Sequence, residues 1–229
     1  MATSSPRGMG RKLQHTDPAV SKMVRRFCNY LARLRAIHNI YKKLYENDEA
    51  KQIMEKTAQS FFVNLNVILN NYLLLEFAKI TDPEASIVKG KIEENFTVNN
   101  LIMRVDWPKN IMSKLEPLRK EANTFRDYIK NARDKLLAHL DKETFLNGKV
   151  LGGFPLGKEE KFLSVLEEIC NITHEACFNS IYGSISVSME GDVEDLKKAL
   201  KRALVFDRVF SESKGEEKAK LFKYLREKL

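Results

Sequence analysis

The chain has 229 residues, 43% of them hydrophobic, which is enough apolar material to bury one sizeable core. Lysine and arginine outnumber aspartate and glutamate by 39 to 31, so a polyanion such as RNA is a plausible partner. Three cysteines cannot all pair within one chain, and the amino-terminal residues lack the apolar stretch of a secretion signal, so we expect a cytoplasmic protein.

The first third of the chain predicts a tail and two long helices. Residues 1–16 have no apolar periodicity and predict a disordered basic tail. An Asp-Pro pair at 17–18 forms an N-cap and a first-turn proline, and begins a helix that should end near Tyr45. A second helix should run to about Ile80. Its most apolar stretch, residues 61–77, contains four asparagines and a glutamate, so we expect a central bundle helix and not a membrane span.

The remainder of the chain also predicts helices. Pro83 should end the second helix, with a loop over residues 81–86. Only residues 185–188 have an extended pattern, and they are too few for a sheet. The expected fold is an all-α bundle of about six to seven helices, in one domain from residue 17 to 229. The later helices are predicted at about 98–105, 108–143 and 162–176, with two more between 190 and 228 and a glycine-rich connector before residue 158.

Residues 125–143, FRDYIKNARDKLLAHLDKE, combine an apolar helix stripe with an arginine and a histidine. At 100° per residue, Arg133 and His139 border opposite edges of the stripe, about 120° apart. One helix therefore does not bring the two side chains together, whereas the same helix from a second subunit would line one cleft with both copies of each. If the partner helix is the same one from a symmetry-related subunit, the protein is a homodimer through this helix. The stripe consists of Phe125, Ile129, Ala132, Leu136 and Leu140.

The chemistry that suits such a cleft is cleavage of RNA by its own 2′-hydroxyl. Histidine, with an ordinary pKa of about 6.5, can take a proton from that hydroxyl or return one to the leaving oxygen. Arginine can hold two phosphate oxygens and stabilise the transition state. This mechanism needs neither a metal nor a cofactor, and DNA would be bound but not cut. Residues expected to contact the RNA are Lys130, Asn131, Lys135 and Lys142.

The run NARDKLLAHLDKE resembles the signature of the HEPN superfamily, in which an arginine and a polar neighbour precede a histidine by a few residues. Asp134 stands in the polar position. The preceding segments LLLEFAKITDPEAS and NFTVNNLI are similar, in this order, to those of the abortive-infection AbiU-like branch. The resemblance covers about residues 40–205.

The resemblance implies a four-helix HEPN core with extra helices that dimerises through the motif helices. It implies a metal-independent endoribonuclease of phage defence or a toxin, with an antitoxin as a possible further partner. Arg133 and His139 match the catalytic pair, and Asp134 would position them. Members that work beside a nucleotidyltransferase carry a tyrosine two places after the histidine. Asp141 occupies that place here, so regulation by nucleotide transfer is not expected.

Three alternatives stay open at this point. The same fold can act as a catalytically inactive scaffold that binds RNA or protein, or as a purely structural helical adaptor. Cys170, His174 and Cys177 share one helix face and include zinc-ligand types, but a structural zinc site takes four ligands and no second pair has the right spacing. We therefore expect the cysteines to pack in the core.

Overall fold

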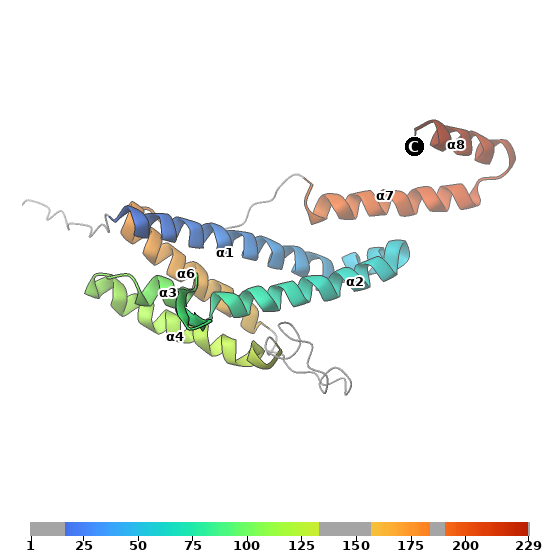
Figure 1. The fold of residues 1–229 in the computed structure, drawn as a ribbon. Helices are drawn as coiled ribbons and strands as arrows, with labels where there is room; N and C mark the ends of the chain where they lie inside the picture. The colour runs from blue at the N-terminus through green and yellow to red at the C-terminus, as the bar shows by residue number, and fades with distance from the viewer. Residues whose placement is uncertain (1–16, 133–156, 184–190, 229) are drawn as a thin grey trace, which may run out of the picture. The chain divides into compact units, whose positions relative to one another are not determined.

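The computed structural model describes residues 17–132, 157–183 and 191–228, and the side chains of all but 131–132 and 225–228 among these. Within them lie seven helices and one two-stranded sheet, which confirms the all-α prediction (Figure 1). The predicted tail, the connector up to residue 156 and the extended stretch at 185–188 lie outside the described residues. The helices are α1 (Pro18–Tyr45), α2 (Asp48–Ile80), α3 (Val98–Met103), α4 (Lys109–Ala132), α6 (Lys158–Phe178), α7 (Val193–Glu212) and α8 (Gly215–Lys228).

The chain divides into two compact units, and both long helices contribute to each of them. The first unit contains residues up to 35 and 71–185, and the second contains residues 36–70 and those from 186 onward. The motif helix α4 belongs to the first unit. The prediction of one domain over residues 17–229 stays a prediction.

Three aromatic rings join α2, α4 and α6 in the core of the first unit. Phe125 of α4 and Phe162 of α6 stack with ring centroids 4.3 Å apart, and Phe77 of α2 meets both rings edge-on at 5.8 and 5.4 Å. Phe125 and Ile129 are 4% and 1% exposed, which confirms two of the five residues of the predicted apolar stripe. Because these two residues are buried within the chain itself, a second subunit cannot use them.

Local sequence signals set the helix boundaries of both units. Thr97 caps α3, because its side chain accepts a hydrogen bond from the Asn100 amide. Asp192 caps α7 in the same way, as predicted, by accepting from the amide of Glu194 at 2.8 Å. Trp107 is buried between α3 and α4 and donates its indole N–H to the Leu101 carbonyl at 3.0 Å.

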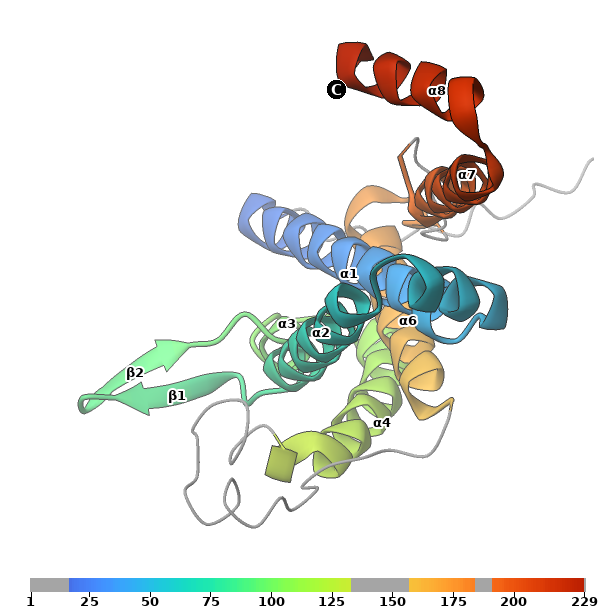
Figure 2. The ribbon, with the colours of Figure 1, turned by 90° about the vertical axis from the view of Figure 1, so that its right-hand side faces the viewer.

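A turn at residues 81–84 and then a β-hairpin follow α2. The predicted loop over 81–86 is therefore confirmed for its first four residues, whereas the prediction of no sheet was wrong. Strands β1 (Ala85–Val88) and β2 (Lys91–Glu94) pair antiparallel and project from the helices of the first unit (Figure 2). Lys89 and Gly90 form the turn, with φ of +50° and +77°. Positive φ at both central residues is typical of the tight turns that join two strands. The hairpin is solvated on both faces, so its sequence lacks the alternation that marks a half-buried strand.

The second unit has a smaller apolar core, made by the end of α1, the first half of α2 and the start of α7. Its buried residues are Leu44, Met54, Phe62 and Val193. A kink at Ala58, with φ of −144° and ψ of 59°, divides α2 and was not predicted. Within the described residues, α2 is also long and apolar enough to cross a membrane, a property that it shares with core helices of globular proteins. The prediction of no membrane partner stays a prediction.

Candidate functional site

The proposed catalytic residues follow directly after the described part of α4. Arg133, Asp134, Lys135, His139 and Lys142 all lie outside the described residues. Of the other two predicted RNA contacts, Lys130 is exposed in the last turn of α4, and Asn131 belongs to the helix without a described side chain. The roles of all seven residues therefore stay predictions. The structure describes helix α4, which precedes the motif.

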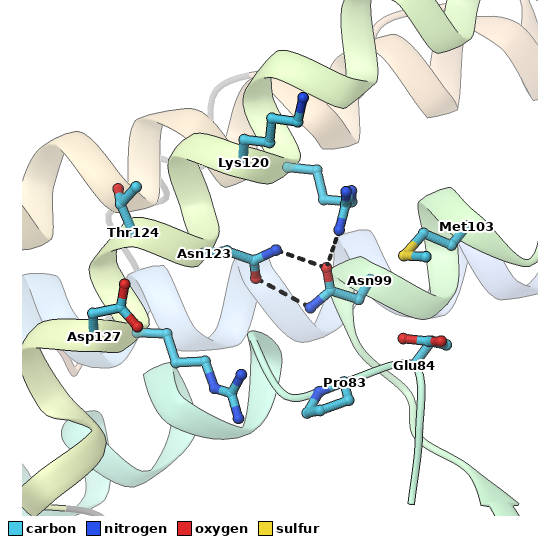
Figure 3. A pocket seen from close by; sticks show the side chains of 10 residues that line it. Pro83, Glu84, Asn99, Met103, Lys120, Asn123, Thr124 and Asp127 are labelled. Carbon is cyan, nitrogen blue, oxygen red and sulfur yellow. Dashed lines mark hydrogen bonds between the residues drawn. The ribbon is translucent and has the colours of Figure 1, made fainter.

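The side of α4 that precedes the motif forms one wall of a pocket of about 450 Å³ (Figure 3). The opposite wall comes from the segment between α2 and β1 and from α3. Sequence reasoning did not find this pocket. The wall on α4 includes Arg119, Asn123, Arg126 and Asp127, and the facing wall includes Glu84 and Asn99.

Asn99 of α3 is the hydrogen-bonding centre of this pocket. Its side chain is buried, with 5% of the residue exposed. The amide nitrogen donates to Asn123 Oδ1 at 3.1 Å, and the amide oxygen accepts from Asn123 Nδ2 at 2.9 Å and from Arg119 at 3.1 Å (Figure 3). The same amide nitrogen also donates to the carbonyls of Thr81 and Asp82. One side chain thus joins the end of α2, α3 and α4.

The segment NFTVNN holds the segment TDPE through asparagine amides. Four consecutive carbonyls, from residue 81 to 84, each accept a hydrogen bond from one of three asparagines at distances of 2.9–3.2 Å. A non-helical turn takes carbonyls out of the helical hydrogen-bond pattern, and amide side chains satisfy them here; the Glu84 carbonyl also accepts from the backbone amide of Asn95 at 2.9 Å. The donors are Asn99 to Thr81 and Asp82, Asn95 to Pro83, and Asn100 to Glu84. Three asparagines within six residues were the available sequence signal.

Arg119 is committed to structural contacts. Its guanidinium donates two parallel hydrogen bonds of 2.8 Å to the carboxylate of Glu116, and a third to Asn99. The paired bonds lower the pKa of Glu116 and raise the pKa of Arg119. Such two-point pairing fixes the orientation of the guanidinium as well as its charge state. Arg119 therefore supports the pocket wall and is occupied on the side that faces Asn99.

Arg126 lies on the same wall and has fewer polar contacts than Arg119. Its ion-pair partner is Asp82, with 3.8 Å between Nη2 and Oδ1, which is longer than a hydrogen bond. The Nε atom is buried, and no described residue accepts a hydrogen bond from it. About a third of the side chain, 29%, is exposed. The pocket thus contains one arginine with unused donors.

The cysteines pack in the core of the first unit, as predicted. Cys28, Cys170 and Cys177 are all buried. A hydrogen bond with Cys28, together with burial, raises the pKa of the Cys170 thiol well above its usual value. The ring nitrogen Nδ1 of His174 lies 2.7 Å from the carbonyl of Ser180. Each of these side chains therefore has a structural role.

Comparison with known proteins identifies the family. The helical bundle and the motif segments are those expected of a HEPN domain. A family model described as AbiU2, one of the HEPN families, matches residues 17–199. The chain therefore belongs to the AbiU2 family of HEPN domains. No curated protein and no solved structure matches the chain.

Proposed function

We propose that this protein is a metal-independent endoribonuclease that acts in phage defence or as a toxin. The observation that carries the proposal is the AbiU2 match over residues 17–199, which includes the arginine, its polar neighbour and the histidine. Arg133 and His139 are the proposed catalytic pair, and Asp134 positions them. The proposed place of action is the cytoplasm, and an antitoxin is a proposed further partner.

In the proposed reaction, His139 takes the proton from a ribose 2′-hydroxyl, and the oxygen attacks the adjacent phosphorus. The bond to the 5′-oxygen breaks, and that oxygen receives a proton from the second histidine of the cleft. Arg133 holds the two non-bridging phosphate oxygens, where negative charge grows in the transition state. The products are a 2′,3′-cyclic phosphate and a 5′-hydroxyl. Lys135 and Lys142 hold neighbouring phosphates of the strand.

The proposed cleft requires two copies of the motif helix. Phe125 and Ile129 are already buried within the chain, so the stripe residues left for a second copy to cover are Ala132, Leu136 and Leu140. We therefore propose a homodimer whose contact begins after Ile129. This pairing brings together two arginines and two histidines that one helix holds apart.

The first test is cleavage of mixed cellular RNA by the purified protein in EDTA. We expect fragments with 5′-hydroxyl ends, because the nucleophile belongs to the RNA and no metal takes part. DNA under the same conditions should stay intact. If RNA is bound but not cut, with or without Mg²⁺, the protein is an inactive scaffold of the same fold. If cutting needs Mg²⁺, the proposed mechanism is wrong.

A further inference from the structure

Arg126 has donors that the described part of the protein does not use. About a third of its side chain, 29%, is exposed, and its one ion pair is longer than a hydrogen bond, so a ligand that supplies oxygen atoms can bind the exposed end of the guanidinium. Asp82 is too distant to accept a hydrogen bond at 3.8 Å, and the buried Nε has no described acceptor. Arg119, on the same wall, is already bonded to Glu116 and Asn99. Arg126 is therefore the arginine of this pocket that is available to a ligand.

The position of Arg126 on α4 relates it to the proposed catalytic arginine. Lys130 follows it by four residues, so the two cations lie on the same face of α4. Arg133 follows Arg126 by seven residues, and in the helix predicted from sequence over residues 108–143 it would lie about 20° away on the helical wheel. The rise over seven helical residues is about 10 Å. The spacing thus predicts a row of three cations that begins at the pocket and ends at Arg133.

We propose that Arg126 binds a backbone phosphate of the RNA strand, at a nucleotide other than the one that is cut. This inference rests on the proposed function, because it assigns a path to the same substrate. The planar guanidinium can hold two oxygens of one phosphate. The predicted helix would separate Arg126 from Arg133 by about 10 Å, so this would be a different phosphate from the reacting one. Arg126 thereby holds the strand in register with the cleft.

The carboxylates that line the pocket disfavour a small free anion and favour a longer polyanion as the ligand. Glu84 and Asp127 also line the pocket, and they oppose the binding of a small free anion (Figure 3). A strand that Lys130 and the motif lysines also hold keeps its phosphate beside Arg126 in spite of these carboxylates. The pocket is thus a subsite for a polyanion.

The test measures RNA binding in the His139→Ala protein, so that the probe stays intact. The probe is a fluorescein-labelled single-stranded RNA of mixed sequence, titrated at several salt concentrations and followed by anisotropy. Adding Arg126→Ala should weaken binding about tenfold and make the slope of log K against log salt shallower by about 0.7, the value for one phosphate contact on a single strand. Lys114→Ala is the matched control, because it removes one exposed positive charge from α4 outside the pocket.

Two further variants distinguish the loss of a phosphate contact from a folding defect in Arg126→Ala. Arg126→Lys keeps the charge, so the salt slope should stay while the affinity falls by less than in Arg126→Ala. Asp82→Asn removes the carboxylate beside Arg126 and should tighten binding; a purely structural ion pair would not give this result. Equal affinities for Arg126→Ala and Lys114→Ala would overturn the inference, even if the wild type cleaves RNA. If the wild type never cleaves RNA but Arg126→Ala still weakens RNA binding, the proposed nuclease activity is wrong and the role of Arg126 in RNA binding stands.

Discussion

Replacing His139 by alanine is expected to slow RNA cleavage by about 10²–10⁴-fold, the usual contribution of a general acid or base. The reason is that alanine can neither accept the proton of the 2′-hydroxyl nor return one to the leaving oxygen. RNA affinity should change little, because the arginines and lysines that contact phosphate remain. The measurement is the single-turnover rate in EDTA with protein in excess, together with the dissociation constant from anisotropy.

His174→Ala is the matched control for this prediction. His174 is on α6, and its Nδ1 lies beside the carbonyl of Ser180. Its removal should leave the cleavage rate unchanged. Arg133→Lys should show an intermediate loss, because an ammonium group keeps the charge but cannot hold two phosphate oxygens in a plane. Cleavage at the wild-type rate by His139→Ala would remove the histidine from the mechanism.

Replacing Asn99 by alanine is expected to lower the free energy of unfolding by about 3 kcal/mol, because several buried polar groups lose their partner at once. The carbonyls of Thr81 and Asp82 lose their donor, and Asn123 and Arg119 lose their acceptor. For a chain of this size the loss corresponds to a fall in Tm of about 6–12 °C. The measurement is thermal unfolding followed by circular dichroism.

Asn110→Ala is the control for this stability prediction. Asn110 lies at the start of α4 with an exposed side chain, and its replacement should change the free energy of unfolding by less than about 0.5 kcal/mol. Similar Tm values for the two variants would show that the bonds of Asn99 contribute little net stability. Such a result would also weaken the interpretation of NFTVNN as the segment that holds the turn after α2.

The helices could be predicted from sequence because their signals are local. The Asp-Pro pair at 17–18 and Asp192 mark helix starts, and α1 and α2 end at Tyr45 and Ile80, where the pattern placed their ends. The buried positions Phe125 and Ile129 follow from the 3.6-residue period alone. Each of these predictions needs only a short window of sequence.

The features that the sequence did not reveal depend on contacts between distant segments or on weak local preferences. The hairpin from Ala85 to Glu94 has solvent on both faces, so its apolar residues Ile87 and Ile92 form no periodic pattern with a core. The bonds from Asn99 to Thr81 and Asp82 span 17–18 residues and depend on how α3 packs. The pocket of Arg126 requires the side chains of three separate elements, which no spacing rule places together.

Family resemblance and helical spacing gave different parts of the candidate site. The spacing singled out Arg133 and His139, and the resemblance matched them to the catalytic pair and added Asp134; the family match covers all three positions. The spacing predicted the buried stripe, and the structure shows that Phe77 and Phe162 cover Phe125 within the same chain. The start of the stripe is therefore not available for contact with a second subunit.

The most direct measurement uses a strand in which one ribose is replaced by 2′-deoxyribose. A cleavage site is first mapped on cellular RNA, and a short synthetic RNA containing it is made with and without the 2′-hydroxyl on the 5′ side of the cut. In EDTA the all-ribose strand should be cut, whereas the substituted strand should bind equally well and stay intact at that position, because it lacks the nucleophile. Cutting of both strands at the same rate would contradict the proposed reaction.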